Sequence, residues 1–175
     1  MSRTDLARRI HAAAHLTGEF TLRSGAVSNE YFDKYRFEAD PALLRDIAEA
    51  MVPLVPKDAE VLAGLELGGV PLATMLSQLT GLPAAFVRKE AKTYGTCRLA
   101  EGAAVEGKRL CIVEDVVTSG GAILDAASEL RMQNAQLGPV VCVIDRESGG
   151  VEKLAVEGLE LSALFTMSEL NSAGA

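Results

Sequence analysis

Two acidic residues, Glu114 and Asp115, stand just before the small hydroxylated turn Thr118-Ser119-Gly120-Gly121. Glycines let a backbone approach a ligand closely, and free N–H groups at a helix start bind anions, so this turn is typical of a phosphate site. Carboxylates would repel that phosphate, which indicates that they accept hydrogen bonds from a diol or interact with a metal. Phosphate beside vicinal hydroxyls points to a ribose 5-phosphate. The alternative is a plain strand end followed by a helix cap.

The acidic pair and the turn need a strand before them and a helix after them. Residues 111–113 form an apolar run rich in β-branched side chains, which predicts a buried strand. After the turn, Ile123, Ala126, Ala127 and Leu130 recur at helical spacing. We therefore predict strand, turn and helix, with the carboxylates where the strand ends.

The same order recurs elsewhere in the chain. A buried strand over 61–65 precedes the glycine turn 66–69, and an apolar run over 140–144 precedes Asp145 and Arg146. Ligands collect at the carboxyl ends of strands in open α/β sheets. Strands near residues 61, 84, 108 and 140, separated by helical segments, predict a Rossmann-like α/β fold with a mainly parallel central sheet flanked by helices.

The two ends of the chain are predicted to form a small hood within one domain of 175 residues. Residues 2–17 have the spacing of an amphipathic helix, and strand-like pieces follow at 20–25 and 29–36. The alternating residues 159–165 predict a last strand. We place residues 1 to about 40 and this C-terminal segment in the hood.

The composition narrows the classes of partner. With 24 acidic against 17 basic residues, the net charge is −7, which argues against a nucleic-acid-binding protein. There is no apolar run of the roughly 18 residues that a membrane span needs, and the first ten residues lack the apolar core of a signal peptide. We therefore expect a cytoplasmic protein without a membrane partner.

The histidines and cysteines are interpreted as structural. His11 and His15 stand one helical turn apart, a spacing that can chelate zinc, but no acidic or thiol partner lies nearby in the sequence. Cys97, Cys111 and Cys142 lack metal-type spacing, and the last two lie inside apolar runs. We expect reduced thiols, with Cys97 exposed.

The stretch VEDVVTSGG, residues 113–121, resembles the phosphoribosyl pyrophosphate motif of type I phosphoribosyltransferases. The resemblance implies that Glu114 and Asp115 hold the ribose hydroxyls and that residues 118–121 anchor the 5′-phosphate. The phosphoribosyl pyrophosphate-binding residues that the motif implies are Glu114, Asp115, Val116, Val117, Thr118, Ser119, Gly120, Gly121 and Ala122.

Three further segments resemble the orotate phosphoribosyltransferases of that family. FTLRSG, residues 20–25, places Arg23 near the orotate and pyrophosphate groups, and the aromatic pair Tyr31 and Phe32 takes the positions that contact the orotate ring. Arg146 matches the arginine that binds the orotate carboxylate, which suits a planar guanidinium. Thr118 is the remaining residue implied at the orotate site.

A basic segment supplies the implied catalytic cations. Arg88, Lys89 and Lys92 match the arginine-lysine-x-x-lysine core of the family's flexible catalytic loop, and Tyr94 stands where a histidine is usual. The connection from Lys89 to Gly107 is long, which suits a mobile lid or a loop without function. In the family this loop reaches into the neighbouring subunit's site, which implies a homodimer with shared active sites.

The turn at 66–69 corresponds to the family's pyrophosphate loop. Many orotate enzymes carry a lysine where this chain has Gly68, so this turn offers no side-chain cation. Leu67 and Gly68 would therefore bind the pyrophosphate through their backbone N–H groups. Mg²⁺ is expected on the pyrophosphate, and no residue is assigned as its direct ligand.

The resemblance thus implies an enzyme, orotate phosphoribosyltransferase, that acts on small-molecule substrates in pyrimidine biosynthesis. The implied catalytic residues are Arg88, Lys89, Lys92, Glu114 and Asp115. Two alternatives stay open: transfer to another nucleobase, and a regulator that senses phosphoribosyl pyrophosphate without turning it over.

Overall fold

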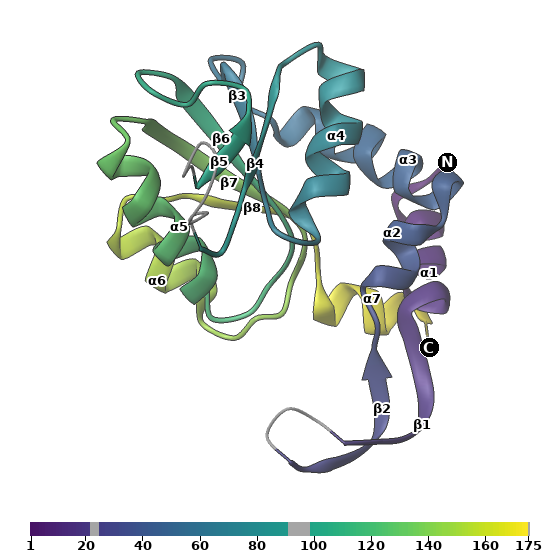
Figure 1. Cartoon of the computed structure of the whole chain (residues 1–175). Helices are drawn as coiled ribbons and strands as arrows, with labels where there is room; N and C mark the ends of the chain where they lie inside the picture. The colour runs from purple at the N-terminus through teal and green to yellow at the C-terminus, as the bar shows by residue number, and fades with distance from the viewer. Residues whose placement is uncertain (22–24, 91–98, 175) are drawn as a thin grey trace.

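The apolar runs of the sequence form a six-stranded sheet in the order β5-β4-β3-β6-β7-β8 (Figure 1). The computed structural model describes residues 1–21, 25–90 and 99–174. Every neighbouring pair of strands is parallel except β4 and β5. This confirms the predicted α/β fold with a mainly parallel sheet. The strands are β3 (Val61–Leu65), β4 (Ala84–Val87), β5 (Ala100–Gly102), β6 (Arg109–Val117), β7 (Gln136–Asp145) and β8 (Leu161–Thr166).

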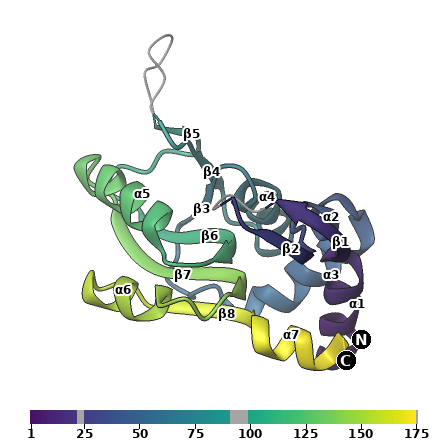
Figure 2. The ribbon, with the colours of Figure 1, turned by 90° about the horizontal axis from the view of Figure 1, so that it is seen from below.

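Helices cover both faces of this sheet (Figure 2). Side chains alternate along β6, so that Cys111 and Val113 enter one core while Leu110 and Ile112 enter the other. The first core is closed by α1 (Arg3–Ala14), α2 (Tyr35–Ala39), α3 (Pro41–Met51), α4 (Gly69–Thr80) and α7 (Met167–Gly174). The second core is closed by α5 (Gly121–Met132) and α6 (Gly150–Val156).

The order of the strands reverses between β3 and β6, the two central strands. From β3 the chain moves outward to β4, whereas from β6 it moves the other way to β7 and β8. In open α/β sheets, ligands bind at the carboxyl ends of the strands on either side of such a reversal. The glycine turn after β3 and the hydroxylated turn after β6 both lie there.

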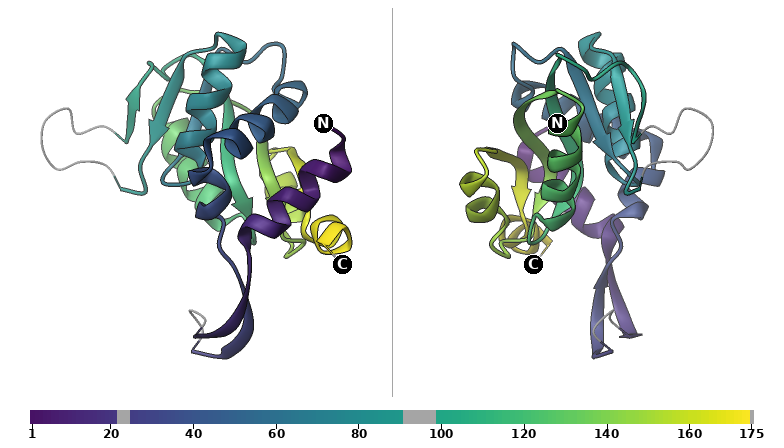
Figure 3. Two further views of the ribbon diagram at one scale, coloured as in Figure 1. Left: turned by 90° about the vertical axis from the view of Figure 1, so that its right-hand side faces the viewer. Right: turned by 60° about the vertical axis from the view of Figure 1, so that its left-hand side comes forward.

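The N-terminal hairpin projects from the body of the molecule (Figures 1 and 3). It consists of β1 (His15–Thr21) and β2 (Val27–Phe32), paired antiparallel. Behind it α1 packs beside α7, which brings the two termini to the same side of the molecule (Figure 2). Asp40 caps α3 through bonds from the N–H groups of Ala42 and Leu43, as expected before Pro41.

Two predicted boundaries at the N-terminus were wrong. The first helix ends at Ala14, and His15 begins β1 instead, because it pairs across the hairpin with Phe32. The second predicted strand stops at Phe32, and Tyr35 begins α2. In both cases a pairing or packing partner that is distant in sequence decides the conformation, which local periodicity does not reveal.

Three further expectations were wrong. The last strand, β8, is not part of the hood; it pairs parallel with β7 at the edge of the main sheet. Strand β5 lies inside the stretch expected to be a loop, because it pairs antiparallel with β4. Strand β7 starts at Gln136, before Gly138 and Pro139. The pairing of β6 with β7 shifts register opposite these two residues. The shift accommodates the proline, which has no N–H to donate to the sheet.

The histidines and two of the cysteines agree with their structural interpretation. The rings of His11 and His15 stack with centroids 4.6 Å apart, which is a packing contact between the two side chains. Cys111 and Cys142 are free, buried thiols, and burial raises the pKa of Cys111 to about 12. Cys97 lies outside the described residues. Within those residues, no helix is long and apolar enough to span a bilayer.

Candidate active site

A short turn joins β6 to α5 at the carboxyl end of the central strand. Gly120 has a φ of +76°, and a Cβ at this position would lie 3.2 Å from the side chain of Leu154. Both the backbone and the available space therefore require glycine. The first N–H groups of a helix have no intrahelical acceptor, so the start of α5 at Gly121 offers donors to an anion. The geometry of this turn suits a phosphate group.

Glu114 and Asp115 belong to β6 itself, because this strand continues to Val117. Their side chains point to opposite faces of the sheet, as successive residues of a strand must. Glu114 lines a cavity on the α5 side, whereas Asp115 is fully buried on the side of α2 and α4. The structure thus separates two carboxylates that we expected to meet the same sugar.

The cavity that Glu114 lines has a volume of about 710 Å³. Its walls come from the carboxyl ends of β3, β4 and β6 and from one face of α5. Arg88 and Lys89 enter it from the end of β4, and Glu66 enters it from the end of β3. Two cations and five carboxylates therefore surround one space, and the carboxylates are those of Glu66, Glu90, Glu114, Asp125 and Glu129.

Glu114 is not an ordinary carboxylate. It is 9% exposed, and the N–H of Asp115 donates to its Oε1 at 3.0 Å. Burial, together with the negative charge of Asp115, raises the pKa of Glu114 to about 8. The neutral acid is therefore favoured over the carboxylate to a higher pH than for an exposed glutamate.

The glycine turn between β3 and α4 is packed against the central strand. A Cβ at Gly69 would lie 2.2 Å from the carbonyl oxygen of Val113. A Cβ at Gly68 would lie 1.6 Å from Asp115 Oδ2 and 2.8 Å from Glu38 Oε1. No side chain fits at position 68, which is a steric reason for glycine where a lysine is often found in the family that the sequence resembles.

Asp115 is enclosed by two residues of the α2 segment that sequence reasoning missed. The Nζ atom of Lys34, the N-cap of α2, lies 2.5 Å from Asp115 Oδ2. Glu38, one helical turn later, is 9% exposed. The i, i+4 spacing of Lys34 and Glu38 indicates a common helix face, but nothing in the sequence shows that this face meets Asp115.

A second, smaller cavity of about 290 Å³ brings together three predicted site residues. Tyr31 and Phe32 from β2 line it together with Arg146, which follows β7. Tyr31 is 45% exposed, as expected for one ring of the aromatic pair, while Phe32 is half-buried against the core. His15 of β1 and Asn171 of α7 also line this cavity and were not predicted as site residues.

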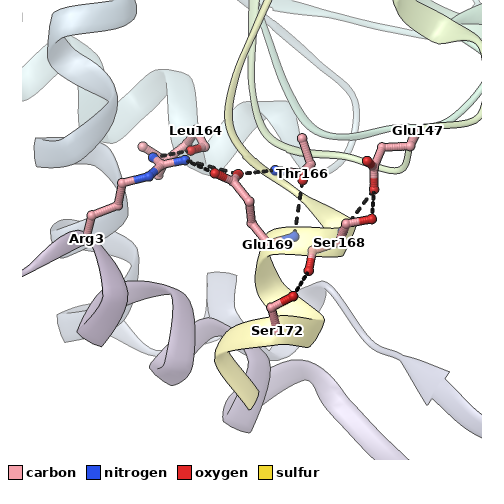
Figure 4. A network of polar contacts seen from close by, with 7 residues as sticks. All are labelled: Arg3, Glu147, Leu164, Thr166, Ser168, Glu169 and Ser172. Carbon is pink, nitrogen blue, oxygen red and sulfur yellow. Dashed lines mark hydrogen bonds and ion pairs between the residues drawn. The ribbon is translucent and has the colours of Figure 1, made fainter. Parts of the chain in front are cut away.

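The segment that carries Arg146 is held from two sides. The N–H of Arg146 donates to the carbonyl of Val117, at 2.8 Å, which joins it to the end of β6. The next residue, Glu147, has a φ of +56° and accepts bonds from the N–H and hydroxyl of Ser168, at 2.9 and 2.6 Å (Figure 4). Glu147 therefore caps the start of α7, and Arg3 pairs with Glu169 of that helix at 2.9 Å.

Comparisons with known proteins identify the family of the chain. The phosphoribosyl transferase domain family matches residues 36–168. The orotate phosphoribosyltransferase of Nocardioides sp. is 55% identical over 168 residues, covering 96% of this chain and 94% of the relative. That of Halobacterium salinarum is 44% identical over 172 residues, covering 97% and 98%. The chain belongs to the orotate phosphoribosyltransferase family.

Solved structures of orotate phosphoribosyltransferases share the fold. The Mycobacterium tuberculosis enzyme in complex with 5-phospho-α-D-ribosyl 1-diphosphate superposes with a TM-score of 0.83 and 29% identity, covering 97% of this chain and 98% of that one. The adenine phosphoribosyltransferase of Thermoanaerobacter pseudethanolicus reaches a TM-score of 0.70 at 18% identity and shares the fold alone.

The remaining residues predicted by analogy with orotate phosphoribosyltransferases divide into two groups. Those whose placement is described lie at the two turns and the two cavities, except Val116 and Val117, which are the last residues of β6 and line neither cavity. Arg23, Lys92 and Tyr94 lie outside the described residues. Thr118 lies in the turn after β6 and does not line the smaller cavity, so its implied contact with orotate stays a prediction.

Proposed function

We propose that this protein transfers the 5-phosphoribosyl group from phosphoribosyl pyrophosphate to orotate, giving orotidine 5′-monophosphate and pyrophosphate. The bond between C1 of the ribose and the pyrophosphate oxygen breaks, and its electron pair leaves with the oxygen. C1 then bonds to N1 of orotate, and the proton of N1 passes to solvent. The observation that carries the choice of base is the smaller cavity, where Arg146 lies with Tyr31 and Phe32.

Arg146 provides the recognition of the acidic base. A guanidinium forms two parallel hydrogen bonds with a planar carboxylate, a group that adenine, hypoxanthine and uracil lack. Tyr31 presents a ring for stacking on the pyrimidine. The segment of Arg146 is bonded to the end of β6, which supports a base site next to the proposed sugar site.

The sugar phosphate is assigned to the larger cavity and the turn beside it. Residues 118–121 would bind the 5′-phosphate through backbone N–H groups and the hydroxyls of Thr118 and Ser119. Glu114 would accept a hydrogen bond from a ribose hydroxyl and stabilise the positive charge that develops at C1. Binding energy from the distant phosphate would orient C1 under the incoming nitrogen.

Cations stabilise the leaving group. Arg88 and Lys89 line the cavity on the side of β4, close to the glycine turn that would receive the pyrophosphate. Lys92 is assigned the same task from its place in the motif. Donors that are already in position where charge develops stabilise a transition state more than flexible solvent does.

Mg²⁺ is assigned to the substrate and not to a protein cage. Mg²⁺ usually keeps several waters and binds substrate phosphates. The oxygen ligands that Mg²⁺ prefers are present in the larger cavity as the carboxylates of Glu66 and Glu114, beside the turn that would receive the pyrophosphate. When bound, the ion would neutralise charge on the pyrophosphate.

The proposed assembly is a homodimer with shared active sites, and the proposed location is the cytoplasm. The dimer is supported by the resemblance of the basic segment after β4 to a loop that completes a neighbour's site. The cytoplasm is supported by the free thiols of Cys111 and Cys142, which are usual in a reducing compartment.

The decisive test follows the ultraviolet absorbance of orotate with purified protein, phosphoribosyl pyrophosphate and Mg²⁺, with adenine, hypoxanthine and uracil in parallel. We expect loss of orotate that depends on every component. Turnover of another base alone would overturn the assignment of Arg146. Tight binding of phosphoribosyl pyrophosphate without turnover of any base would identify a sensor instead of an enzyme.

A further inference from the structure

The α2 segment of the hood reaches into the sheet at Asp115. Lys34 Nζ lies 2.5 Å from Asp115 Oδ2, and the Lys34 side chain is 32% exposed. The other oxygen, Oδ1, accepts the N–H of Val116 at 2.5 Å. Glu38 comes from the same helix and shares the space above Gly68 with Asp115 Oδ2. We call Lys34, Glu38 and Asp115 the hood cluster.

The charges of the hood cluster are balanced by a proton. Burial and a hydrogen bond with Asp115 raise the pKa of Glu38 to about 9, so Glu38 is neutral at physiological pH. Burial alone would raise the pKa of Asp115, but hydrogen bonds with Glu38, Glu114 and Lys34 outweigh it and lower that pKa. One ammonium and one carboxylate therefore face each other, with a protonated acid beside them.

The hood cluster contacts the glycine turn and holds a residue of the strand that leads into the hydroxylated turn. Asp115 precedes the hydroxylated turn by three residues on β6, and its Oδ2 packs against Gly68 of the glycine turn. A change in the position of this carboxylate therefore affects the glycine turn by direct packing and the hydroxylated turn through the end of β6. Glu114, which lines the cavity, is bonded to the backbone of Asp115.

We propose that Lys34 and Glu38 are positioning residues for the binding of phosphoribosyl pyrophosphate. They hold Asp115 in place, and Asp115 in turn keeps the hydroxylated turn and the glycine turn at a fixed separation. The proposal rests on the proposed function, since it assigns the two turns to the two phosphate-bearing ends of one substrate. Lys34 supplies the charge that keeps Asp115 in place, and Glu38 supplies a neutral donor that fits above Gly68.

Three variants test this assignment. Lys34→Met removes the charge at similar length, Lys34→Arg keeps it, and Glu38→Gln replaces the protonated acid by a neutral group of the same shape. Lys108→Met is the matched control, because Lys108 pairs with Glu60 at 2.9 Å among exposed side chains at the opposite ends of the strands. Glu49→Gln, in the exposed pair with Arg45, is the control for the second exchange.

We expect Lys34→Met to weaken the binding of phosphoribosyl pyrophosphate, measured by calorimetry without a base, by about 10- to 100-fold, the size of effect that misplacement of a site causes. The KM for orotate should stay within about twofold, since its cavity is lined by other residues. Lys34→Arg should restore most of the affinity, and Glu38→Gln should keep it at pH 7. Both controls should bind as the wild type does.

The protonation of Glu38 has its own readout. The infrared carbonyl band of a protonated carboxylic acid should be present in the wild type at pH 7 and weaker in Glu38→Gln. Wild-type affinity in Lys34→Met, or equal losses in Lys34→Met and Lys34→Arg, would overturn the positioning role. An unchanged infrared band would overturn the role of Glu38. Binding and infrared data need no turnover, so failure of the proposed reaction is seen separately in the orotate assay.

Discussion

Glu114 and Asp115 are neighbours in the chain, but one side chain lines the larger cavity and the other is buried against the hood. The strand that carries them continues for two residues beyond Asp115, so strand alternation sends them to opposite faces. The two carboxylates therefore have different chemistry. Glu114 lines the cavity that a ligand can enter, whereas Asp115 contacts Lys34 and packs against the glycine turn at Gly68.

The raised pKa of Glu114 predicts a pH dependence of activity. Because the carboxylate is the better acceptor for a ribose hydroxyl, kcat/KM for phosphoribosyl pyrophosphate should rise as pH increases through about 8. Glu114→Gln should remove this rise and lower kcat/KM at pH 9 by about tenfold or more. A Gln variant with the wild-type pH profile would show that another group titrates.

The raised pKa of Glu114 also predicts how the stability of the fold changes with pH. This pKa is higher in the folded protein than the ordinary 4.5, so the native state holds more protons between pH 4.5 and about 8. The free energy of unfolding should therefore fall as pH rises through this window. Urea denaturation of Glu114→Gln should show a smaller fall in the free energy of unfolding over this pH range than the wild type does. Glu38→Gln should also reduce the fall, over a pH range that extends to about 9.

Gly68→Ala tests the close packing of the glycine turn. The new methyl group would lie 1.6 Å from Asp115 Oδ2, so the carboxylate or the turn must move. We expect a loss of about 1–3 kcal/mol in the free energy of unfolding, as for overpacking, and weaker binding of phosphoribosyl pyrophosphate.

Gly81→Ala is the control for that change. Gly81 has a φ of +77° at the end of α4 and open space around it, so alanine there costs about 1 kcal/mol through backbone strain and leaves the site intact. If both variants lose stability but keep the wild-type affinity, Gly68 has no part in binding.

Arg146→Ala should mainly affect the base. Losing hydrogen bonds to a charged carboxylate costs about 1.5–3 kcal/mol, so the KM for orotate should rise about 10- to 100-fold while the affinity for phosphoribosyl pyrophosphate changes little. Arg45→Ala, on the surface of α3, is the control. An unaltered KM for orotate would defeat the assignment.

Lys89→Ala should lower kcat more than it weakens substrate binding. The lysine lines the larger cavity at the end of β4, where it would stabilise charge that appears only as pyrophosphate leaves. A fall in kcat of about 10²- to 10³-fold is expected for the loss of one such group. Lys153→Ala on α6 serves as the control, and unchanged turnover in Lys89→Ala would remove this lysine from the mechanism.

Much of the site could be predicted because it is built from local patterns. Apolar runs followed by charges and glycines predicted the strands β3, β6 and β7 and the ligand-facing edge that they share. The pairing of Tyr31 and Phe32 with Arg146 came from the resemblance of short segments, and one cavity unites them. Residues that touch the ligand need particular chemistry, and that chemistry is visible in the sequence.

The hood cluster could not be predicted in the same way. Lys34 and Glu38 stand about 80 residues before Asp115, and as a charged pair on a short helix they look like a solvated surface. Likewise the last strand gave no sign that it would join the main sheet beside β7, because an alternating pattern fits any half-buried strand.

The sequence by itself determined the central strand-turn-helix units, the two turns that can bind phosphate and the acidic and basic residues beside them, because hydrophobic periodicity and glycine placement act over a few residues. Only the tertiary structure decided that Glu114 and Asp115 face opposite sides, that no side chain fits at Gly68 and that Lys34 and Glu38 enclose Asp115. These relationships depend on which distant segments meet in space, and burial then alters the pKa values of the groups that they bring together.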